Sequence, residues 1–293
     1  MLVRSPVIAP QAPGTSPSPA AAGGPILTVA EIVKRFGVGE DSLLAVDRVS
    51  FSVAQGEFVS LIGPSGCGKS TLFNIIGGLA GNFDGRVAVD GQPVSGTHPA
   101  FGMVFQEEST FPWRTVIDNV AFPLEIAGVG KRERHERARH FVSLVGLDGF
   151  ERRYPAELSG GMRQRVAIAR TLASEPRILL MDEPFAALDE QTRLLLGDKV
   201  LQIHQQLRQT TLLITHNITE AVQLSDRVLV MTYRPGTLKR AVEIDLPRPR
   251  TSEVVGSDAF GHYVAQIWSD LREEASRGIR EDESRTLQRG GAR

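Results

Sequence analysis

The chain contains a single cysteine, Cys67, among its 293 residues. An internal disulfide is therefore excluded, and one thiol cannot build the multi-ligand sites typical of structural zinc. Net charge is also nearly absent, because 33 Lys and Arg are set against 34 Asp and Glu. A protein that neutralises a nucleic-acid backbone needs a broad basic field, so we expect no nucleic-acid partner.

Long hydrophobic runs are missing too. No stretch approaches the roughly 20 apolar residues that cross a bilayer. Prolines interrupt the N-terminal residues where a secretory signal needs an unbroken apolar segment. We therefore expect the chain to be made in the cytoplasm and to remain there. Residues 1–25 hold six prolines and one charge, at Arg4, and this composition predicts a disordered tail.

Short apolar runs alternate with longer helix-like stretches from Ile26 to about Leu246. The runs are Glu57–Ile62, Phe101–Phe105, Ile178–Met181 and Thr211–Ile214. This alternation predicts an α/β fold with a mostly parallel sheet covered by helices. Gly85–Val94, with Asp90-Gly91 at its centre, instead predicts an antiparallel β unit.

No strand-like run appears between Val116 and about Glu175. We therefore expect a helical subdomain, about residues 107–175, inserted into the domain that residues 26–246 form. The segment Lys131–His140 mixes both charges at helical spacing, which favours a solvated helix face over a nucleic-acid contact. Residues 247–293 predict a Pro-Arg-Pro-Arg linker, an amphipathic helix over Ala259–Ala275 and a polar tail.

The most specific chemical motif follows the apolar run that ends at Ile62. It reads Gly63, Pro64, Ser65, Gly66, Cys67, Gly68, Lys69, Ser70 and Thr71, which fits G-x-x-x-x-G-K-[ST]. The helix-like Leu72–Gly77 follows, so strand, loop and helix have the order that this phosphate-binding motif requires. Glycines let consecutive backbone N–H groups converge on phosphate oxygens, and the helix start favours an anion.

The last residues of this loop carry its charged chemistry. Lys69 would contact the β and γ phosphates of ATP, and the Ser70 hydroxyl would be a ligand for Mg²⁺. The alternative is a chance glycine-rich turn between a strand and a helix.

Two adjacent carboxylates, Asp182 and Glu183, end the buried run Ile178–Met181. Ligands bind at the carboxyl ends of strands in open α/β sheets. We expect Asp182 to hold Mg²⁺ and Glu183 to accept the proton of the attacking water. The alternative for such a pair is a solvated turn.

A third motif makes the interpretation specific. It reads Leu158-Ser159-Gly160-Gly161-Met162-Arg163-Gln164-Arg165 and resembles the signature sequence of ABC ATPases. The Ser159 side chain and the N–H groups of Gly160 and Gly161 would form an anion site at a helix start. The resemblance implies that this site grips the γ-phosphate held by the other protomer of a homodimer. An N-capped helix without a ligand is the alternative.

The resemblance extends over nearly all of residues 26–246. Gln106 is similar to the Q-loop glutamine, which implies a contact with Mg²⁺ or the attacking water. Asp189, in Ala187-Leu188-Asp189, resembles the D-loop residue at the dimer interface, although it could equally cap the helix that follows. His216 resembles the switch histidine of the γ-phosphate, and Phe36 stands where the family stacks an aromatic ring on adenine.

Two short stretches, Phe111–Val116 and Asp245–Arg250, resemble the subgroup that serves nitrate, taurine and aliphatic sulfonate importers. The resemblance implies an ATPase at the cytoplasmic face of the membrane, attached through two permease subunits that work with an extracytoplasmic substrate-binding protein. A soluble ABC ATPase and a regulatory subunit that binds nucleotide without hydrolysing it are the alternatives. The cargo is not specified by this chain.

Overall fold

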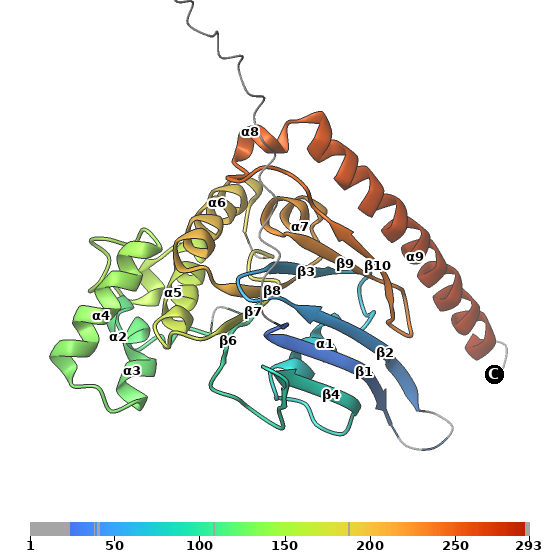
Figure 1. Cartoon of the computed structure of the whole chain (residues 1–293), viewed down its shortest axis with the longest axis horizontal. Coiled ribbons are helices and arrows are strands. Elements are labelled where there is room, and N and C mark those ends of the chain that lie inside the picture. Colours follow the sequence, from blue (N-terminus) through green and yellow to red (C-terminus); the bar gives the residue numbers. More distant parts are fainter. Residues whose placement is uncertain (1–23, 38, 40–41, 108, 187, 291–293) are drawn as a thin grey trace, which may run out of the picture.

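The fold is described from a computed structural model and comprises residues 24–37, 39, 42–107, 109–186 and 188–290. The predicted tail, residues 1–25, lies outside this part of the chain except for its last two residues. Ala187 of the predicted D-loop also lies outside it. Two sheets organise the rest: a six-stranded sheet with order β10-β9-β3-β8-β7-β6 and a four-stranded sheet with order β2-β1-β4-β5 (Figure 1).

The larger sheet confirms the predicted α/β class. Its strands are β3 (Phe58–Ile62), β6 (Phe101–Val104), β7 (Ile178–Asp182), β8 (Thr210–Thr215), β9 (Arg227–Met231) and β10 (Leu238–Glu243). All neighbouring pairs are parallel except β10 with β9. Every residue of β3 and β8 is buried, because parallel strands are covered on both faces and their sequences therefore form continuous apolar runs.

Register places the predicted site residues on one edge of this sheet. Ile62 at the end of β3 pairs with Thr215 of β8, and Asp182 of β7 pairs with Ile214 of the same strand. The phosphate loop, the two carboxylates and His216 therefore leave the sheet side by side, although they are far apart in the sequence.

The smaller sheet is antiparallel. It contains β1 (Leu27–Phe36), β2 (Leu43–Val53), β4 (Asp84–Val89) and β5 (Gln92–Pro93). The hairpin predicted over Gly85–Val94 is confirmed by the pairing of β4 with β5. Asp90 and Gly91 at its tip have φ angles of 49° and 74°, the left-handed conformation that a tight two-residue hairpin turn requires.

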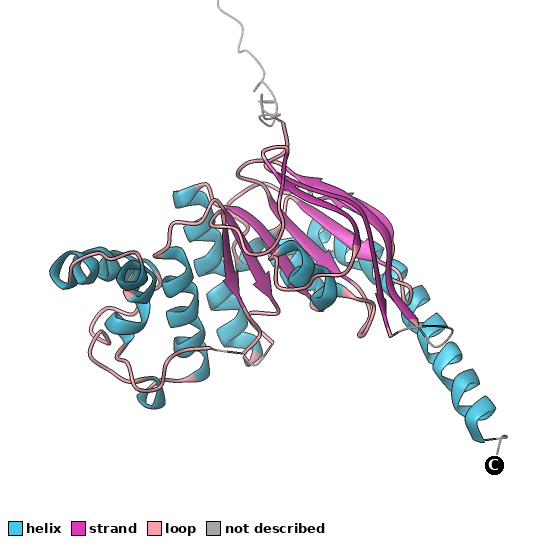
Figure 2. Ribbon diagram, turned by 90° about the horizontal axis from the view of Figure 1, so that it is seen from below, coloured by secondary structure: helices cyan, strands magenta, loops and turns pink. Residues whose placement is uncertain are grey.

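Helices cover both sheets (Figure 2). They are α1 (Lys69–Ile76), α2 (Val116–Val120), α3 (Phe122–Ile126), α4 (Lys131–Leu144), the 3₁₀ turn η2 (Pro155–Glu157), α5 (Gly160–Leu172), α6 (Glu190–Leu207), α7 (Ile218–Leu224), α8 (Ser252–Val255) and α9 (Asp258–Gly290). In Figure 1, α2, α3 and α4 form the end of the molecule farthest from α9. No helix in the described part of the chain is both long and apolar enough to span a membrane.

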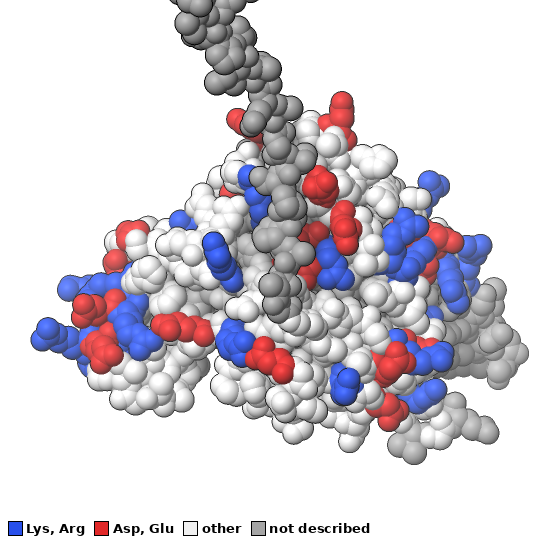
Figure 3. Space-filling model, in the orientation of Figure 1, with Lys and Arg blue, Asp and Glu red and all other residues white. Residues whose placement is uncertain are grey.

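Helix α4 carries the charged segment Lys131–His140. Figure 3 shows positive and negative side chains interspersed on the face that it displays, including the end of the molecule formed by α4. The helix is anchored by Ala138, Phe141 and Val142, which are buried against α2 and α5. Its charged residues therefore form the solvated side of an amphipathic helix.

The C-terminal residues differ from the sequence-based prediction in two ways. Helix α9 runs to Gly290, whereas we predicted a helix over Ala259–Ala275 followed by a polar tail. The added part is rich in Arg and Glu, which have high helix propensity. The Pro-Arg-Pro-Arg linker is also part of the core, since Arg250 is 2% exposed.

The buried Arg250 side chain closes the end of α7. Its guanidinium donates hydrogen bonds to the carbonyl oxygens of Val222, Ser225, Ile244 and Leu246. Burial lowers its pKa to about 10. Backbone carbonyls at a helix C-terminus lack intrahelical donors, so a guanidinium can satisfy several of them at once.

His204 of α6 makes the stability of the fold dependent on pH. Its ring packs edge-on against Phe58 with 5.2 Å between ring centroids, and burial lowers its pKa from 6.5 to about 4. Below pH 6.5 the unfolded chain binds a proton at His204, whereas the folded chain binds it only near pH 4. We therefore expect the free energy of unfolding to fall between pH 6.5 and pH 4, by about 3 kcal/mol in all.

Urea titrations across this pH range test the expectation. Because the His204 Nδ1 atom has no hydrogen-bond partner, His204→Leu should fold and flatten the pH dependence. His140, which is exposed on α4, provides the matched control, and His140→Gln should leave the slope unchanged. If the free energy of unfolding depended equally on pH in wild type and His204→Leu, His204 would not be the cause of the pH dependence.

Candidate functional site

The phosphate loop joins β3 to α1 and has the conformation that its glycines allow. Gly66 and Gly68 have φ angles of 73° and 102°, in the left-handed region that favours glycine. A Cβ atom on Gly68 would also lie 3.0 Å from the Ala45 carbonyl oxygen. The loop therefore tolerates no side chain at this position, just before the helix begins at Lys69.

The Lys69 side chain folds back into the loop. Its ammonium donates hydrogen bonds to the carbonyl oxygens of Gly63 at 2.8 Å and Pro64 at 3.0 Å. The side chain is 6% exposed, so the charge lies within the ring of loop backbone. A phosphate group offers this ammonium a stronger, charge-assisted partner than a carbonyl does.

Asp182 offers a half-buried carboxylate close to the start of α1. Burial raises its pKa and the Glu183 charge adds to this, while a hydrogen bond from Ser70 and the Lys69 charge act in the opposite direction. Its Oδ1 atom is buried without a hydrogen-bond partner. A hydroxyl and an unsatisfied carboxylate oxygen are the ligand types that Mg²⁺ prefers, so these residues fit the metal that the sequence predicts.

Glu183 and His216 are brought together by the pairing of β7 with β8. The His216 Nδ1 atom lies 3.0 Å from the Glu183 Oε2 atom. Glu183 has a φ of 45°, and its backbone N–H donates to the Ile214 carbonyl oxygen at 2.8 Å. Left-handed backbone at a non-glycine residue is uncommon and clusters at functional sites. A carboxylate and an imidazole in contact form a suitable pair for handling a proton.

Ser159 caps α5, as the sequence predicts. Its Oγ atom accepts a hydrogen bond from the Met162 N–H at 3.3 Å. A Cβ atom on Gly161 would lie 2.7 Å from the Thr192 Cγ2 atom, so the helix start packs closely against α6. Ser159 is exposed and Gly160 is half-buried, so the start of the helix is accessible from outside.

Three further predicted residues lie at the ends of elements. Gln106 is exposed two residues after the end of β6. Asp189 caps α6, with its Oδ1 atom accepting from the Thr192 N–H at 2.9 Å, which is the capping role considered from sequence. Phe36 ends β1 with 48% of its surface exposed, and the Lys34 ammonium lies 5.2 Å from its ring centroid.

Cys67 belongs to the loop through its backbone alone. Its side chain is 0% exposed and points into the core, where a Cβ atom on Gly63 would lie 2.8 Å from the Sγ atom. Burial raises the pKa of the thiol against the opposing effect of Lys69. The thiol is therefore neutral and shielded, and it is not placed to act on a ligand.

We expect the folded protein to react with maleimide at least about tenfold more slowly than the protein in urea, since reaction requires local opening. Cys67→Ala should abolish labelling, because no other cysteine is present. Labelling of native protein at the rate seen in urea would show that the thiol faces solvent.

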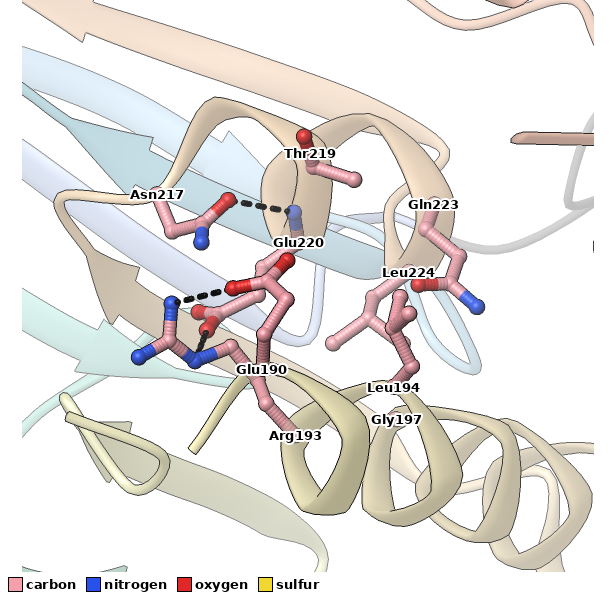
Figure 4. A pocket seen from close by; sticks show the side chains of 9 residues that line it. All are labelled: Glu190, Arg193, Leu194, Gly197, Asn217, Thr219, Glu220, Gln223 and Leu224. Carbon is pink, nitrogen blue, oxygen red and sulfur yellow. Dashed lines mark hydrogen bonds and ion pairs between the residues drawn. The ribbon is translucent and has the colours of Figure 1, made fainter. Parts of the chain in front are cut away.

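Sequence reasoning missed a buried ion pair behind the site, Arg193 with Glu220 (Figure 4). The Arg193 Nε atom lies 3.3 Å from the Glu220 Oε1 atom, and Arg193 also donates to the Leu188 carbonyl oxygen at 3.0 Å. Glu220 accepts a hydrogen bond from the Thr215 hydroxyl at 2.6 Å. The pair thus ties the turn before α6 to the strand end before His216. The sequence offered one signal for it, because Arg193 and Glu220 each follow a predicted site residue, Asp189 or His216, by one helical turn.

Comparison with known proteins identifies the family of this chain. A model of the ABC transporter family matches residues 46–186. The chain is 47% identical to the ABC transporter ATP-binding protein MJ0412 of Methanocaldococcus jannaschii over 87% of this chain and 94% of that protein. It is 43% identical to the nitrate import ATP-binding protein NrtD of Synechocystis, covering 84% and 95% of the two chains.

A third relative, the aliphatic sulfonates import ATP-binding protein SsuB of Bacillus cereus, is 41% identical over 77% of this chain and 88% of its own. Among solved structures, the dimeric ATP-binding cassette MJ0796 bound to ADP and phosphate matches with a TM-score of 0.66. It is 31% identical and covers 75% of this chain and 100% of its own.

The chain therefore belongs to the ABC transporter family, in which it is an ATP-binding subunit. The predicted α/β fold and phosphate-binding motif together define a P-loop NTPase core, and the solved relative confirms this fold. Its activity is ATP hydrolysis coupled to transport.

Proposed function

We propose that this subunit powers the import of a small oxidised anion, either nitrate or an organic sulfonate such as taurine. The observation that carries the proposal is the similarity to NrtD and SsuB, at 43% and 41% identity over more than three quarters of this chain. The stretches Phe111–Val116 and Asp245–Arg250 favour the same group. Selectivity itself would reside in the permease and its extracytoplasmic binding protein.

At the catalytic site, Lys69 and the backbone N–H groups of the phosphate loop hold the phosphates of ATP, and Phe36 stacks on the adenine. Ser70, Asp182 and Gln106 would hold Mg²⁺, which when bound would supply positive charge against the charge that develops on the γ-phosphate. Glu183 accepts the proton of the attacking water, and the hydrogen bond between His216 and Glu183 orients that carboxylate.

A second copy of the chain completes each site. Ser159, Gly160 and Gly161 form an anion site at the start of α5, which in our proposal binds the γ-phosphate held by the partner. Asp189 lies beside this interface. The dimeric state of the solved relative MJ0796 supports the arrangement. ATP drives closure because the closed dimer binds it more tightly than the open one does.

The permease partners would dock near Gln106. Trp113 is 71% exposed, although the residues on either side of it are anchored. The buried Asn119 side chain accepts from the Phe111 N–H at 2.8 Å and donates to the Arg114 carbonyl oxygen at 3.0 Å. A large apolar side chain held out on a fixed turn is typical of a protein contact. This contact would attach the subunit to the cytoplasmic face of the membrane.

Uptake by whole cells tests the proposal. In the organism that carries this gene, its deletion should abolish growth on nitrate as nitrogen source, or on taurine or alkanesulfonates as sulfur source. Growth on ammonium and sulfate should be unaffected. The wild-type gene should restore uptake of the labelled anion, and Lys69→Ala should not. A deletion strain with normal uptake of all these anions would exclude the proposed cargo class.

A further inference from the structure

The turn between β9 and β10 lies between the phosphate loop and α9. It contains Tyr233, Arg234, Pro235 and Gly236. None of these residues belongs to the motifs on which the family resemblance is based. Figure 1 shows α9 running beside β9 and β10. The contacts of this turn on its two sides form a continuous path from the C-terminal helix to the nucleotide site.

On one side, the turn touches the phosphate loop directly. The Arg234 Nε atom donates to the Gly66 carbonyl oxygen at 2.8 Å. Gly236 lies so close to the loop that a Cβ atom on it would be 2.0 Å from the Cys67 carbonyl oxygen. Two successive carbonyl groups of the loop thus face this turn.

The same turn is tied to the neighbouring strand. The Gly236 N–H donates to the Ala45 carbonyl oxygen at 2.9 Å, and the Asp47 N–H donates to the Gly236 carbonyl oxygen at 3.0 Å. Ala45 is also the residue whose carbonyl oxygen blocks a side chain on Gly68. The turn and β2 therefore contact each other, and both pack against the backbone of the phosphate loop.

On the other side, α9 holds the turn through a buried carboxylate. Glu274 is 6% exposed, and its Oε2 atom accepts from the Tyr233 N–H at 3.0 Å. Its Oε1 atom lies 2.9 Å from the Lys239 ammonium on β10. The helix approaches the turn at Gly278, where a Cβ atom would lie 2.7 Å from the Tyr233 ring.

These contacts restrict the orientation of the loop. A peptide unit is planar, so an arginine that fixes the Gly66 carbonyl also fixes the direction of the Cys67 N–H. Backbone N–H groups are the donors that bind phosphate in such a loop. A buried carboxylate with both oxygens paired is costly to displace, so Glu274 provides a rigid support for the turn.

We propose that Arg234 is a positioning residue for the phosphate loop and that α9 holds it in place through Glu274. The inference rests on the proposed role of residues 63–71 in binding ATP. The C-terminal helix thereby contributes to nucleotide affinity without contacting the nucleotide.

Nucleotide affinity and steady-state kinetics of the full-length chain test the proposal. Arg234→Ala should raise the Kd and the KM for ATP by about three- to tenfold, which corresponds to the net contribution of one typical hydrogen bond. The kcat at saturating ATP should stay within about twofold. Arg234→Lys keeps a charged donor and should recover part of the loss. A purely structural effect would reduce the folded fraction and leave the KM of the folded molecules unchanged.

A double-mutant cycle tests the link to α9. Glu274→Ala should raise the KM in the same direction, and the pair with Arg234→Ala should be no worse than Arg234→Ala alone. Arg272→Ala, on the exposed side of α9, is the control and should have no effect. Additive effects, or an unchanged KM in Arg234→Ala, would overturn the proposal. If wild type bound ATP but supported no anion uptake, the proposed cargo would fail while this inference stood.

Discussion

Glu183→Gln should bind MgATP with the affinity of the wild type while its turnover falls by about 10²-fold or more, the range for removing a general base. The amide keeps the shape of the side chain and can still hydrogen-bond to His216, which lies 3.0 Å from the carboxylate. The substitution therefore removes the base and keeps the geometry. Nucleotide binding by calorimetry and phosphate release by the purified chain measure the two effects.

The control for this experiment is a carboxylate outside the site. Glu243 is exposed on β10, and Glu243→Gln should hydrolyse ATP at the wild-type rate. Near-normal turnover by Glu183→Gln would show that another group accepts the proton of the attacking water.

Mixing two inactive variants should restore an ATP-occluded dimer. Lys69→Ala removes the charge inside the phosphate loop. Ser159→Arg puts bulk and a misplaced charge at the start of α5, where we propose that the γ-phosphate of the partner binds. Each variant alone should fail to occlude ATP. A mixed dimer collects both lesions in one composite site and leaves the other intact.

Occlusion is the quantity to measure, because the two sites of a dimer can be coupled and one intact site need not turn over. The control carries both substitutions on one chain and is paired with wild type. That dimer contains no intact composite site and should not occlude. Absence of occlusion in mixed dimers whose formation has been demonstrated would mean that Ser159 does not act across the interface.

The sequence was most informative where one physical requirement determines the residue types at several consecutive positions. Buried parallel strands require continuous apolar runs, so the positions of β3, β7 and β8 were predicted to within one residue at either end. The functional loops follow those strands, and register then brings Asp182, Glu183 and His216 to one edge.

Contacts between distant segments could not be predicted in this way. Arg234 and Gly66 are 168 positions apart, and no local pattern connects them. Cys67 shows the same limit at short range, because a loop position predicts where the backbone lies but not that the side chain enters the core. The antiparallel strands β1 and β2 were missed, since three register shifts interrupt their pairing and blur the alternation that identifies a strand.

The buried Arg250 ties residues beyond the catalytic motifs to the folded core. The last catalytic residue along the chain is His216, yet Arg250 donates hydrogen bonds to the carbonyl oxygens of Val222 and Ile244 within the core. A chain shortened after Leu246 would retain every motif of the catalytic site. It would also lose the residue that closes α7, the helix that starts two residues after His216. The residues that form the catalytic site and the residue that supports its neighbouring helix α7 therefore lie in different segments of the chain.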